Sequence, residues 1–311
     1  MHWRRKLLGF ASAAIVAPVV WAGGSGAVRN ARPVVVLSSS GAPAYREAVA
    51  GFRSTMGGTA SPEVFEMGER DNDMLTRIQA AKPRLVVAIG SRATVAAASL
   101  DAPVLSIMVM EAETGTVLAG SSPKRMVSRI PLDVPPRTAL ARLKRLFPDR
   151  RRIAVIWGPA GSRRAQAEIA SAAAMHGLTV KFVECGSPKE MLEAVPALAG
   201  AVDLVWCLPD RALYEPAPVQ ALILFSIRAR LPLIGFSIGF VKAGALAGFQ
   251  ADYSQIGAQA AESAQQFLEG APLRVREDPR VVRTIVNERA VRIFGIGLQT
   301  PAGGEEMVLV K

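Results

Sequence analysis

Residues 232–253 read Pro-Leu-Ile-Gly-Phe-Ser-Ile-Gly-Phe-Val-Lys-Ala-Gly-Ala-Leu-Ala-Gly-Phe-Gln-Ala-Asp-Tyr. The run from Leu231 to Phe236 is apolar on both faces, which is typical of a buried parallel strand. A second run, from Ala243 to Phe249, is rich in small residues, which suit a strand that other backbone approaches closely. The stretch therefore predicts two strands close together in the sequence.

A helix pattern follows the second strand directly, from Tyr253 to Leu268. We expect the second strand to carry the chain from one lobe of the protein to another. Ser237, Asp252 and Tyr253 would then face the gap between the two lobes.

Strands and helices alternate along the rest of the chain in two sets of similar size. The first set has predicted strands at 34–37, 62–67, 85–89 and 104–109, with helices at 43–56, 71–81 and 93–98. The second set has strands at 153–157, 179–184, 204–208 and 233–236, with helices at 135–147, 163–176, 188–198 and 219–230. This alternation predicts an α/β fold of two doubly wound parallel-sheet lobes around a central cleft.

The alternation pauses at 111–123, a polar segment that contains glycine. Because the strand at 243–249 crosses back, each lobe is discontinuous in sequence. We expect a first lobe of residues 28–130 plus 247–278 and a second lobe of residues 131–246 plus 279–298. Residues 281–296 predict one strand and one short helix, and residues 299–311 form a tail.

The N-terminus has the pattern of a secretory signal, and we assign residues 1–27 to a signal peptide and linker. Arg4, Arg5 and Lys6 form a basic segment before an apolar run at 7–20. The alternatives are an uncleaved anchor, although Pro18 interrupts the apolar run, and export by a twin-arginine rather than a general secretory route. Since no cysteine lies near the cleavage point, a lipid anchor is not expected. The mature chain is therefore predicted to be soluble in the periplasm.

The formal charge of +11 does not indicate a nucleic-acid-binding function, because of how the charges are distributed. Removing the three basic residues of the signal leaves 34 basic residues against 26 acidic ones, a charge of +8. These charges are scattered, and the longest basic run, Arg150 to Arg152, stands just before a strand. Scattered charges are typical of a solvated surface rather than of a nucleic-acid site.

The histidine count argues against an enzyme. His2 leaves with the signal, so that His176 is the sole histidine of the mature chain. A Ser-His-Asp triad and histidine-rich metal sites are therefore not expected. No Cys-x-x-Cys or Walker-type Gly-Lys-Ser/Thr is present, and we predict no catalytic residue, metal or cofactor. Chemistry by an acid pair such as Glu111 and Asp210 is not excluded by counting.

Several segments together resemble one known family. They are the helix and strand at 137–157, the strand at 202–210 that ends Leu-Pro-Asp, Leu-Pro-Leu-Ile-Gly-Phe-Ser at 231–237, Ala-Gly-Ala-Leu-Ala at 243–247, and Asp252-Tyr253 with Gly257 in the helix that follows. The chain resembles the ABC-transporter substrate-binding proteins with the type I periplasmic binding protein fold, in the branch that includes binders of aromatic amino acids. It departs from them at 110–113, where Met-Glu-Ala-Glu replaces an Asp-Pro pair often found after the fourth strand.

The resemblance implies a monomer that captures a small organic solute, such as an amino acid, and delivers it to an inner-membrane ABC permease with its ATPase. The departure at 110–113 keeps a second hypothesis open. In that alternative the same fold senses a ligand, or binds none, and regulates an envelope receptor or sensor.

Polar residues that follow predicted strands are the candidate ligand contacts, because ligands of open α/β sheets bind beyond the carboxyl ends of the strands. In the first lobe, serine hydroxyls and helix-start N–H groups could hold an anion, and Glu111 could pair with an amine. The alternative for each is a helix cap or a solvated loop. These first-lobe candidates are Ser39, Ser40, Ser91, Thr94 and Glu111.

The second lobe offers an aromatic residue and acids at the same kind of position. Trp157 could stack on a flat ligand or pack in the core, and Asp210 is the best partner there for an amine. Phe236 and Ser237 offer one apolar and one polar contact. Asp252 stands at the crossing, where it could equally cap the next helix.

Cys185 and Cys207 are predicted to be free thiols. In a doubly wound strand order, the strand at 153–157 lies between the two strands that carry them. Strands two apart are separated by roughly 9–10 Å. A disulfide needs Cα atoms within about 7 Å, so the intervening strand prevents the bond.

Overall fold

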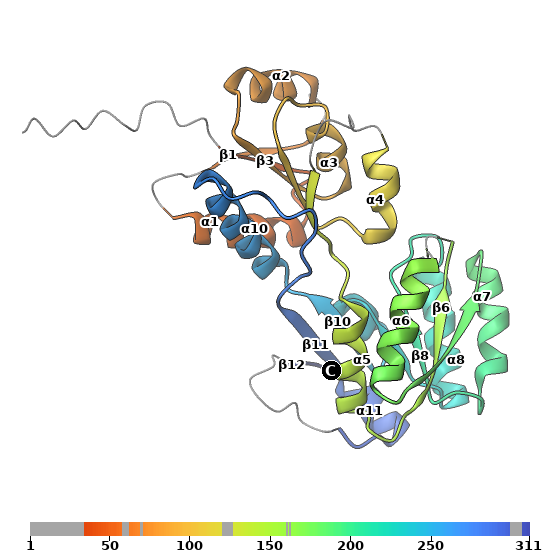
Figure 1. The fold of residues 1–311 in the computed structure, drawn as a ribbon. Coiled ribbons are helices and arrows are strands. Elements are labelled where there is room, and N and C mark those ends of the chain that lie inside the picture. Colours follow the sequence, from red (N-terminus) through yellow and green to blue (C-terminus); the bar gives the residue numbers. More distant parts are fainter. Residues whose placement is uncertain are drawn as a thin grey trace, which may run out of the picture. The chain divides into compact units, whose positions relative to one another are not determined.

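Five parallel strands form the first sheet of the computed structural model, which describes residues 34–57, 62–68, 71–119, 127–159, 161, 163–298 and 307–311 (Figure 1). The order is β2 (Glu63–Glu66), β1 (Val34–Ser38), β3 (Leu85–Ile89), β4 (Val104–Ile107) and β5 (Val127–Ile130). Both sheets belong to one compact part of the chain, Arg32–Lys311. The predicted signal at 1–27 lies outside the described residues.

Helices cover both faces of the first sheet, because alternate strand residues point to opposite sides. Val36 and Val87 pack with α1 (Pro43–Met56) and α10 (Tyr253–Leu268). Val35 and Val86 pack on the other face with α2 (Asp71–Ala81) and α3 (Ser91–Ala97).

A further helix, α4 (Glu111–Leu118), occupies the segment where the pause in the alternation was expected. That expectation was incomplete. Glu111 and Glu113 lie in the first turn of α4, where negative charge favours a helix start. The helix also contains Thr114, Gly115 and Thr116, which are weak helix formers and hide it from a propensity argument.

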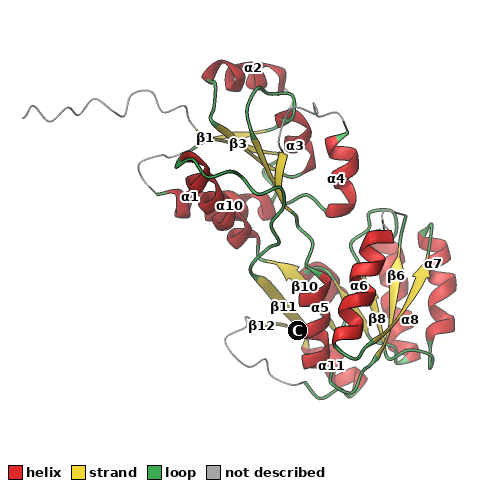
Figure 2. Ribbon diagram, viewed as in Figure 1, coloured by secondary structure: helices red, strands yellow, loops and turns green. Residues whose placement is uncertain are grey.

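Among the described residues the second sheet has seven strands, and Figure 2 draws the strands in yellow. Their order is β12 (Met307–Val310), β11 (Val282–Asn287), β10 (Ala247–Ala251), β9 (Leu233–Gly235), β8 (Leu204–Cys207), β6 (Arg152–Trp157) and β7 (Thr179–Glu184). All pairs are parallel except β10 with β11. The predicted α/β class with two doubly wound sheets is confirmed.

The second sheet also buries an apolar cluster on each face. One cluster joins the strands to α5 (Pro136–Leu146), α6 (Arg163–Met175) and α11 (Glu288–Phe294). The other joins them to α7 (Pro188–Ala194), its 3₁₀ extension Val195–Leu198, α8 (Pro216–Ala229) and α9 (Ile238–Ala243). Among the helices described, none is both long enough and apolar enough to cross a membrane.

The crossing strand differs from its prediction in bounds and in lobe. The strand expected at 243–249 begins at Ala247, because Ser237 caps α9 and Gly244, at φ 132°, ends it. β10 pairs with β9 and β11, so residues 247–251 lie in the second sheet and not with the first lobe as expected. The chain therefore leaves the second sheet at Asp252, where α10 begins.

The predicted tail also contains a structural element. Residues 307–310 form β12, which pairs in parallel with β11 and adds an edge to the second sheet. Met307–Val310 is an unbroken apolar run, and Val310 is buried in one cluster with Ile285 and Val241. Residues 299–306 lie outside the described part of the chain.

The order of strands around the cysteines is confirmed. Cys207 ends β8 and Cys185 follows β7, with β6 between these two strands. Both residues are buried free thiols.

Candidate functional site

A cavity of about 450 Å³ lies beyond the carboxyl ends of four parallel strands of the second sheet. Residues at or after the ends of β6, β8, β9 and β10 line one side. The start of α4, the segment at 132–136, α5, α6, Tyr253 and Arg276 complete the lining. This is the position at which open α/β sheets bind ligands, and the volume suits a small organic molecule.

Aromatic side chains make up much of the lining. Trp157 at the end of β6 packs edge-on against Phe182, with ring centroids 5.4 Å apart and planes 81° apart. Gly161 lies directly against the indole, and a Cβ atom there would lie 2.2 Å from Trp157 Cε2. The indole is therefore held in place from two sides. The other aromatic lining residues are Trp206, Phe236, Phe249 and Tyr253.

Asp210 is the buried acid of the second-sheet side. It follows β8 and is 9% exposed. Its Oδ1 accepts a hydrogen bond of 2.8 Å from the N–H of Ala212. Its Oδ2 lies against Gly158, where a Cβ atom would come within 2.0 Å. The absence of a side chain at Gly158 thus leaves the carboxylate room beside the cavity.

A second acid, Asp133, lies opposite the start of α4. The N–H of Glu111 donates to Asp133 Oδ2 at 2.7 Å. The Glu111 carboxylate pairs with Arg129 and Arg276, each at 3.3 Å, and Arg276 also pairs with Asp278 at 2.6 Å. Burial raises the pKa of Asp133 to about 6, and the nearby Glu111 charge acts in the same direction. Asp133 therefore titrates near neutrality in this lining.

Five of the predicted contact residues line the cavity: Glu111, Trp157, Asp210, Phe236 and Ser237. Trp157 also belongs to the core, so both interpretations of this residue apply. Ser237 Oγ accepts from the N–H of Phe240 at 3.2 Å and caps α9. Tyr253, which was expected to face the gap, is also in the lining.

The other first-lobe candidates have structural partners and do not line this cavity. Ser39 Oγ accepts from the N–H of Ala93 at 2.9 Å, and Ser40 Oγ accepts from that of Ala42 at 3.3 Å. Ser91 Oγ donates to Glu113 Oε2 at 2.5 Å.

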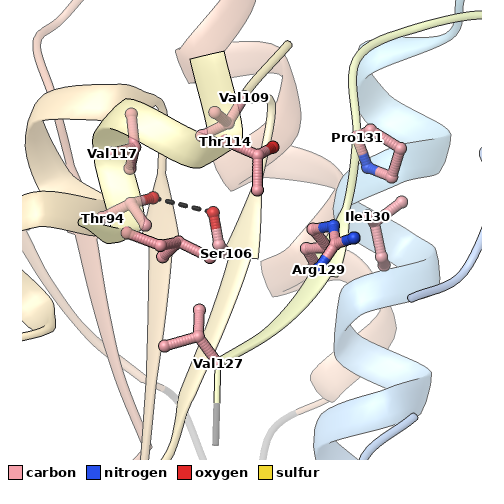
Figure 3. A pocket seen from close by; sticks show the side chains of 10 residues that line it. Thr94, Ser106, Val109, Thr114, Val117, Val127, Arg129, Ile130 and Pro131 are labelled. Carbon is pink, nitrogen blue, oxygen red and sulfur yellow. Dashed lines mark hydrogen bonds between the residues drawn. The ribbon is translucent and has the colours of Figure 1, made fainter. Parts of the chain in front are cut away.

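Thr94 is buried next to a much smaller space. Its Oγ1 donates to the carbonyl of Gly90 and lies 2.8 Å from Ser106 Oγ, and Figure 3 shows the two hydroxyls facing each other. The space that they border has a volume of about 10 Å³. It is too small for an organic ligand.

Asp252 is a helix cap, the alternative considered for it. Its Oδ1 accepts from the N–H of Gln255 at 3.1 Å, and its Oδ2 pairs with Arg283 at 2.6 Å. Although burial opposes it, hydrogen bonds from Ser254 and Gln255 and the Arg283 charge hold the pKa of Asp252 below its usual range. The carboxylate is thus engaged on both oxygens.

Sequence reasoning did not select several residues of the lining. Asp133 follows β5, so the strand-end rule could have found it. Trp206 and Phe249 lie inside strands and reach the cavity from the sheet face that α5 and α6 cover. Gln250 and Arg276 lie in segments for which the sequence carries no comparable signal.

Residues 235–239, Gly-Phe-Ser-Ile-Gly, match the Gly-x-Ser-x-Gly pattern of hydrolase nucleophile turns. The local geometry does not fit that chemistry. Ser237 has an extended backbone, with φ −151° and ψ 157°, rather than a strained one, and its hydroxyl is a helix cap. His176 follows α6 and is not in the lining. Within the described ranges, no three His, Cys, Asp or Glu side chains could hold a metal ion.

Two doubly wound sheets with a ligand-sized cavity at the strand ends define the class of type I periplasmic binding proteins. The model of the family described as ABC transporter substrate binding protein matches residues 69–301, and the chain belongs to this family. The predicted resemblance is confirmed.

Three relatives illustrate the similarity. A tyrosine-binding protein of Clostridioides difficile strain R20291 is 26% identical over 194 residues, which are 61% of this chain and 56% of that protein. The match thus spans little more than half the length of this relative. A ligand-free, open substrate-binding protein with adhesive properties from Clostridium difficile has a TM-score of 0.69 at 20% identity, covering 90% of this chain and 99% of the other. A Streptococcus pneumonia domain in complex with L-Trp has a TM-score of 0.58 at 18% identity, covering 89% and 99%.

Proposed function

We propose that the chain captures a small aromatic solute of amino-acid size and delivers it to an inner-membrane ABC permease. The observation that carries this proposal is the cavity of about 450 Å³ with five aromatic side chains and a buried acid in its lining. Pockets of this size, mostly apolar with a few placed polar groups, bury small ligands well. The tyrosine-binding relative and the structural neighbour in complex with L-Trp support the same solute class.

Each group would have a distinct role in this capture. Trp157 would stack on the flat part of the solute, and Phe236 would contact its edge. Asp210 would pair with an amine, since a hydrogen bond to a charged group is stronger than a neutral one. Ser237 and Gln250 would present polar atoms at the rim.

Delivery requires that the protein work outside the inner membrane. We propose the periplasm as its location and a permease with its ATPase as its partners. The lobes in this proposal are residues 28–130 with 252–278, and 131–251 with 279–311. Hinge motion between two such lobes is the usual way in which binding proteins enclose a ligand.

Thermal unfolding of the purified protein with added amino acids and other small metabolites tests the proposal. A solute at 100 times its dissociation constant should add about 2.7 kcal/mol to the free energy of unfolding. We expect aromatic compounds to give the largest shifts. If no solute shifts the unfolding temperature, the capture function is wrong.

Substituting Trp157 tests the stacking role. Trp157→Ala should weaken binding of the best solute by about tenfold, whereas Trp157→Phe should retain part of the affinity because it keeps a ring. Phe65→Ala is the control, because Phe65 is a half-buried aromatic residue of β2 away from the cavity. Equal losses in Trp157→Ala and Phe65→Ala, measured by calorimetry, would contradict the assignment.

A further inference from the structure

Gln250 is a buried amide in the lining of the cavity. It belongs to β10, is 7% exposed, and lies two residues beyond the point where Gly248 pairs with Gly235 at the end of β9. Its Oε1 accepts a hydrogen bond of 2.9 Å from the N–H of Ile238. Because a backbone N–H can only donate, the oxygen of the amide has to face Ile238, and the NH2 group takes the other side. The backbone at Ile238 therefore determines the orientation of this side chain.

The amide nitrogen of Gln250 is a donor without a partner. In the part of the chain that the structure describes, Gln250 Nε2 makes no hydrogen bond, although the NH2 group carries two donors. A buried donor that has no acceptor is unfavourable. Since Gln250 lines the cavity, an acceptor on a bound solute can reach it there.

Ser237 offers a second donor close by. Its Oγ accepts from the N–H of Phe240 at 3.2 Å, an interaction that leaves the hydroxyl hydrogen to be donated elsewhere. Ser237 directly precedes Ile238, whose N–H holds the Gln250 amide, and both Ser237 and Gln250 line the cavity. The start of α9 thus brings two neutral donors together in the lining.

The basic residue of the lining is less available to a solute oxygen. Arg276 pairs with Glu111 at 3.3 Å and with Asp278 at 2.6 Å. An oxygen on a solute would have to compete with two carboxylates for this guanidinium. Among the described residues, the amide nitrogen of Gln250 meets no such competition.

We propose that Gln250 is a specificity-determining residue, whose amide donates to a carboxyl or carbonyl oxygen of the aromatic solute, with Ser237 as the second donor. This inference rests on the proposed function, since it specifies the end group that the same cavity requires. A solute that carries such an oxygen pairs with the buried donor, whereas one that lacks it leaves the donor unpaired. The cavity therefore selects aromatic acids and their amides over amines with the same ring.

Isothermal titration calorimetry of the purified protein with tryptophan, tryptophanamide and tryptamine tests the inference. The three ligands share the ring and the amine. Tryptophan carries a carboxylate, tryptophanamide carries an uncharged carbonyl oxygen, and tryptamine carries neither. We expect tryptophan and tryptophanamide each to bind at least about tenfold more tightly than tryptamine. Tyrosine, tyrosinamide and tyramine repeat the comparison with a second ring and should give the same order.

The variant Gln250→Glu tests the source of the preference, because it keeps an oxygen acceptor for Ile238 and replaces the donor with a second oxygen. The ratio of tryptophan affinity to tryptamine affinity should fall at least about tenfold. Gln250→Met, which has neither the donor nor a charge, should lower the same ratio. Gln266→Glu is the matched control, since it makes the first change at an exposed glutamine of α10 outside the lining, and it should keep the ratio of the unmodified protein.

The ratio separates recognition from a general effect on structure, because a loss of folded protein lowers both affinities alike. Gln250 variants that keep the full preference for tryptophan would overturn the role of this residue. In the unmodified protein, which needs no variant to fold, tryptamine that binds as tightly as tryptophan or tryptophanamide would overturn the inference and leave the proposed function standing. If none of these aromatic ligands binds, both the inference and the proposed function are wrong.

Discussion

Asp133 is an acid placed next to another acid in the lining of the cavity. It accepts the N–H of Glu111, and burial raises its pKa from 3.8 to about 6. An acid with a raised pKa binds its proton more tightly in the folded state than in the unfolded state. Its contribution to stability is therefore fully present below about pH 4 and is lost as the pH rises through about 6.

The variant Asp133→Asn should remove this dependence while keeping an oxygen acceptor for Glu111. The free energy of unfolding of the unmodified protein, minus that of the variant, should fall by up to about 3 kcal/mol between pH 4 and pH 7. Denaturant unfolding of both proteins at each pH measures it. A difference that is constant across this range would show that Asp133 titrates normally.

The packing of helix α10 against helix α1 depends on glycine residues. The two helices lie side by side (Figure 1), and glycines stand where their backbones meet. A Cβ atom on Gly257 would lie 1.9 Å from the carbonyl oxygen of Ala48, and one on Gly51 would lie 1.9 Å from that of Ser254. Close packing of α10 on α1 therefore requires glycine at both positions.

Gly257→Ala should destabilise the protein by about 1–3 kcal/mol, because the new methyl group meets backbone that can move only if the helices separate. Gly115→Ala is the control. Gly115 lies in α4 with open space around its Cα atom, so alanine there should be neutral or should stabilise by about 0.5–1 kcal/mol. Denaturant unfolding measures both. Similar stabilisation in the two variants would mean that the helices are not in close contact.

At the scale of the whole molecule, the strand order of the second sheet determines whether the two cysteines can form a disulfide. With β6 between β7 and β8, Cys185 and Cys207 cannot form a bond within one chain. Burial also raises the pKa of the Cys207 thiol to about 12, which keeps it protonated. An oxidising compartment would therefore leave both thiols intact.

Denatured, unreduced protein should contain two thiols that react with a thiol reagent. Folded protein at pH 8 should react much more slowly, because the thiolate is the reactive form and both side chains are buried. A sample reduced before denaturation serves as the control and should give the same count. A count of zero in monomeric, unreduced protein would contradict the strand order.

Strong local signals predicted many elements closely. The helices at 43–56 and 253–268 both have the predicted bounds. Proline marks the start of the first helix, and the Asp252 cap marks the start of the second. The two helices pack against each other although they are distant in sequence. By contrast, α9 has only the residues Ile238–Ala243, with a β-branched residue and glycine at its start. Too few residues are present for a helical period, so a strand and a helix could not be told apart there.

The sequence alone determined the α/β class and the two sets of alternating elements, because these follow from local periodicity. The general rule for open α/β sheets then indicated the strand ends as the place for a ligand. The sequence could not separate a ligand contact from a helix cap, since Ser39, Asp210, Ser237 and Asp252 offer the same oxygen chemistry at the same kind of position. Only the tertiary structure shows which partners these side chains have. It directs Ser39 toward the N–H of Ala93 and Asp252 toward Arg283, and it places Asp210 in the lining beside Trp157 and Phe249. The physical reason is that partners distant in sequence are chosen by packing, which no local pattern encodes.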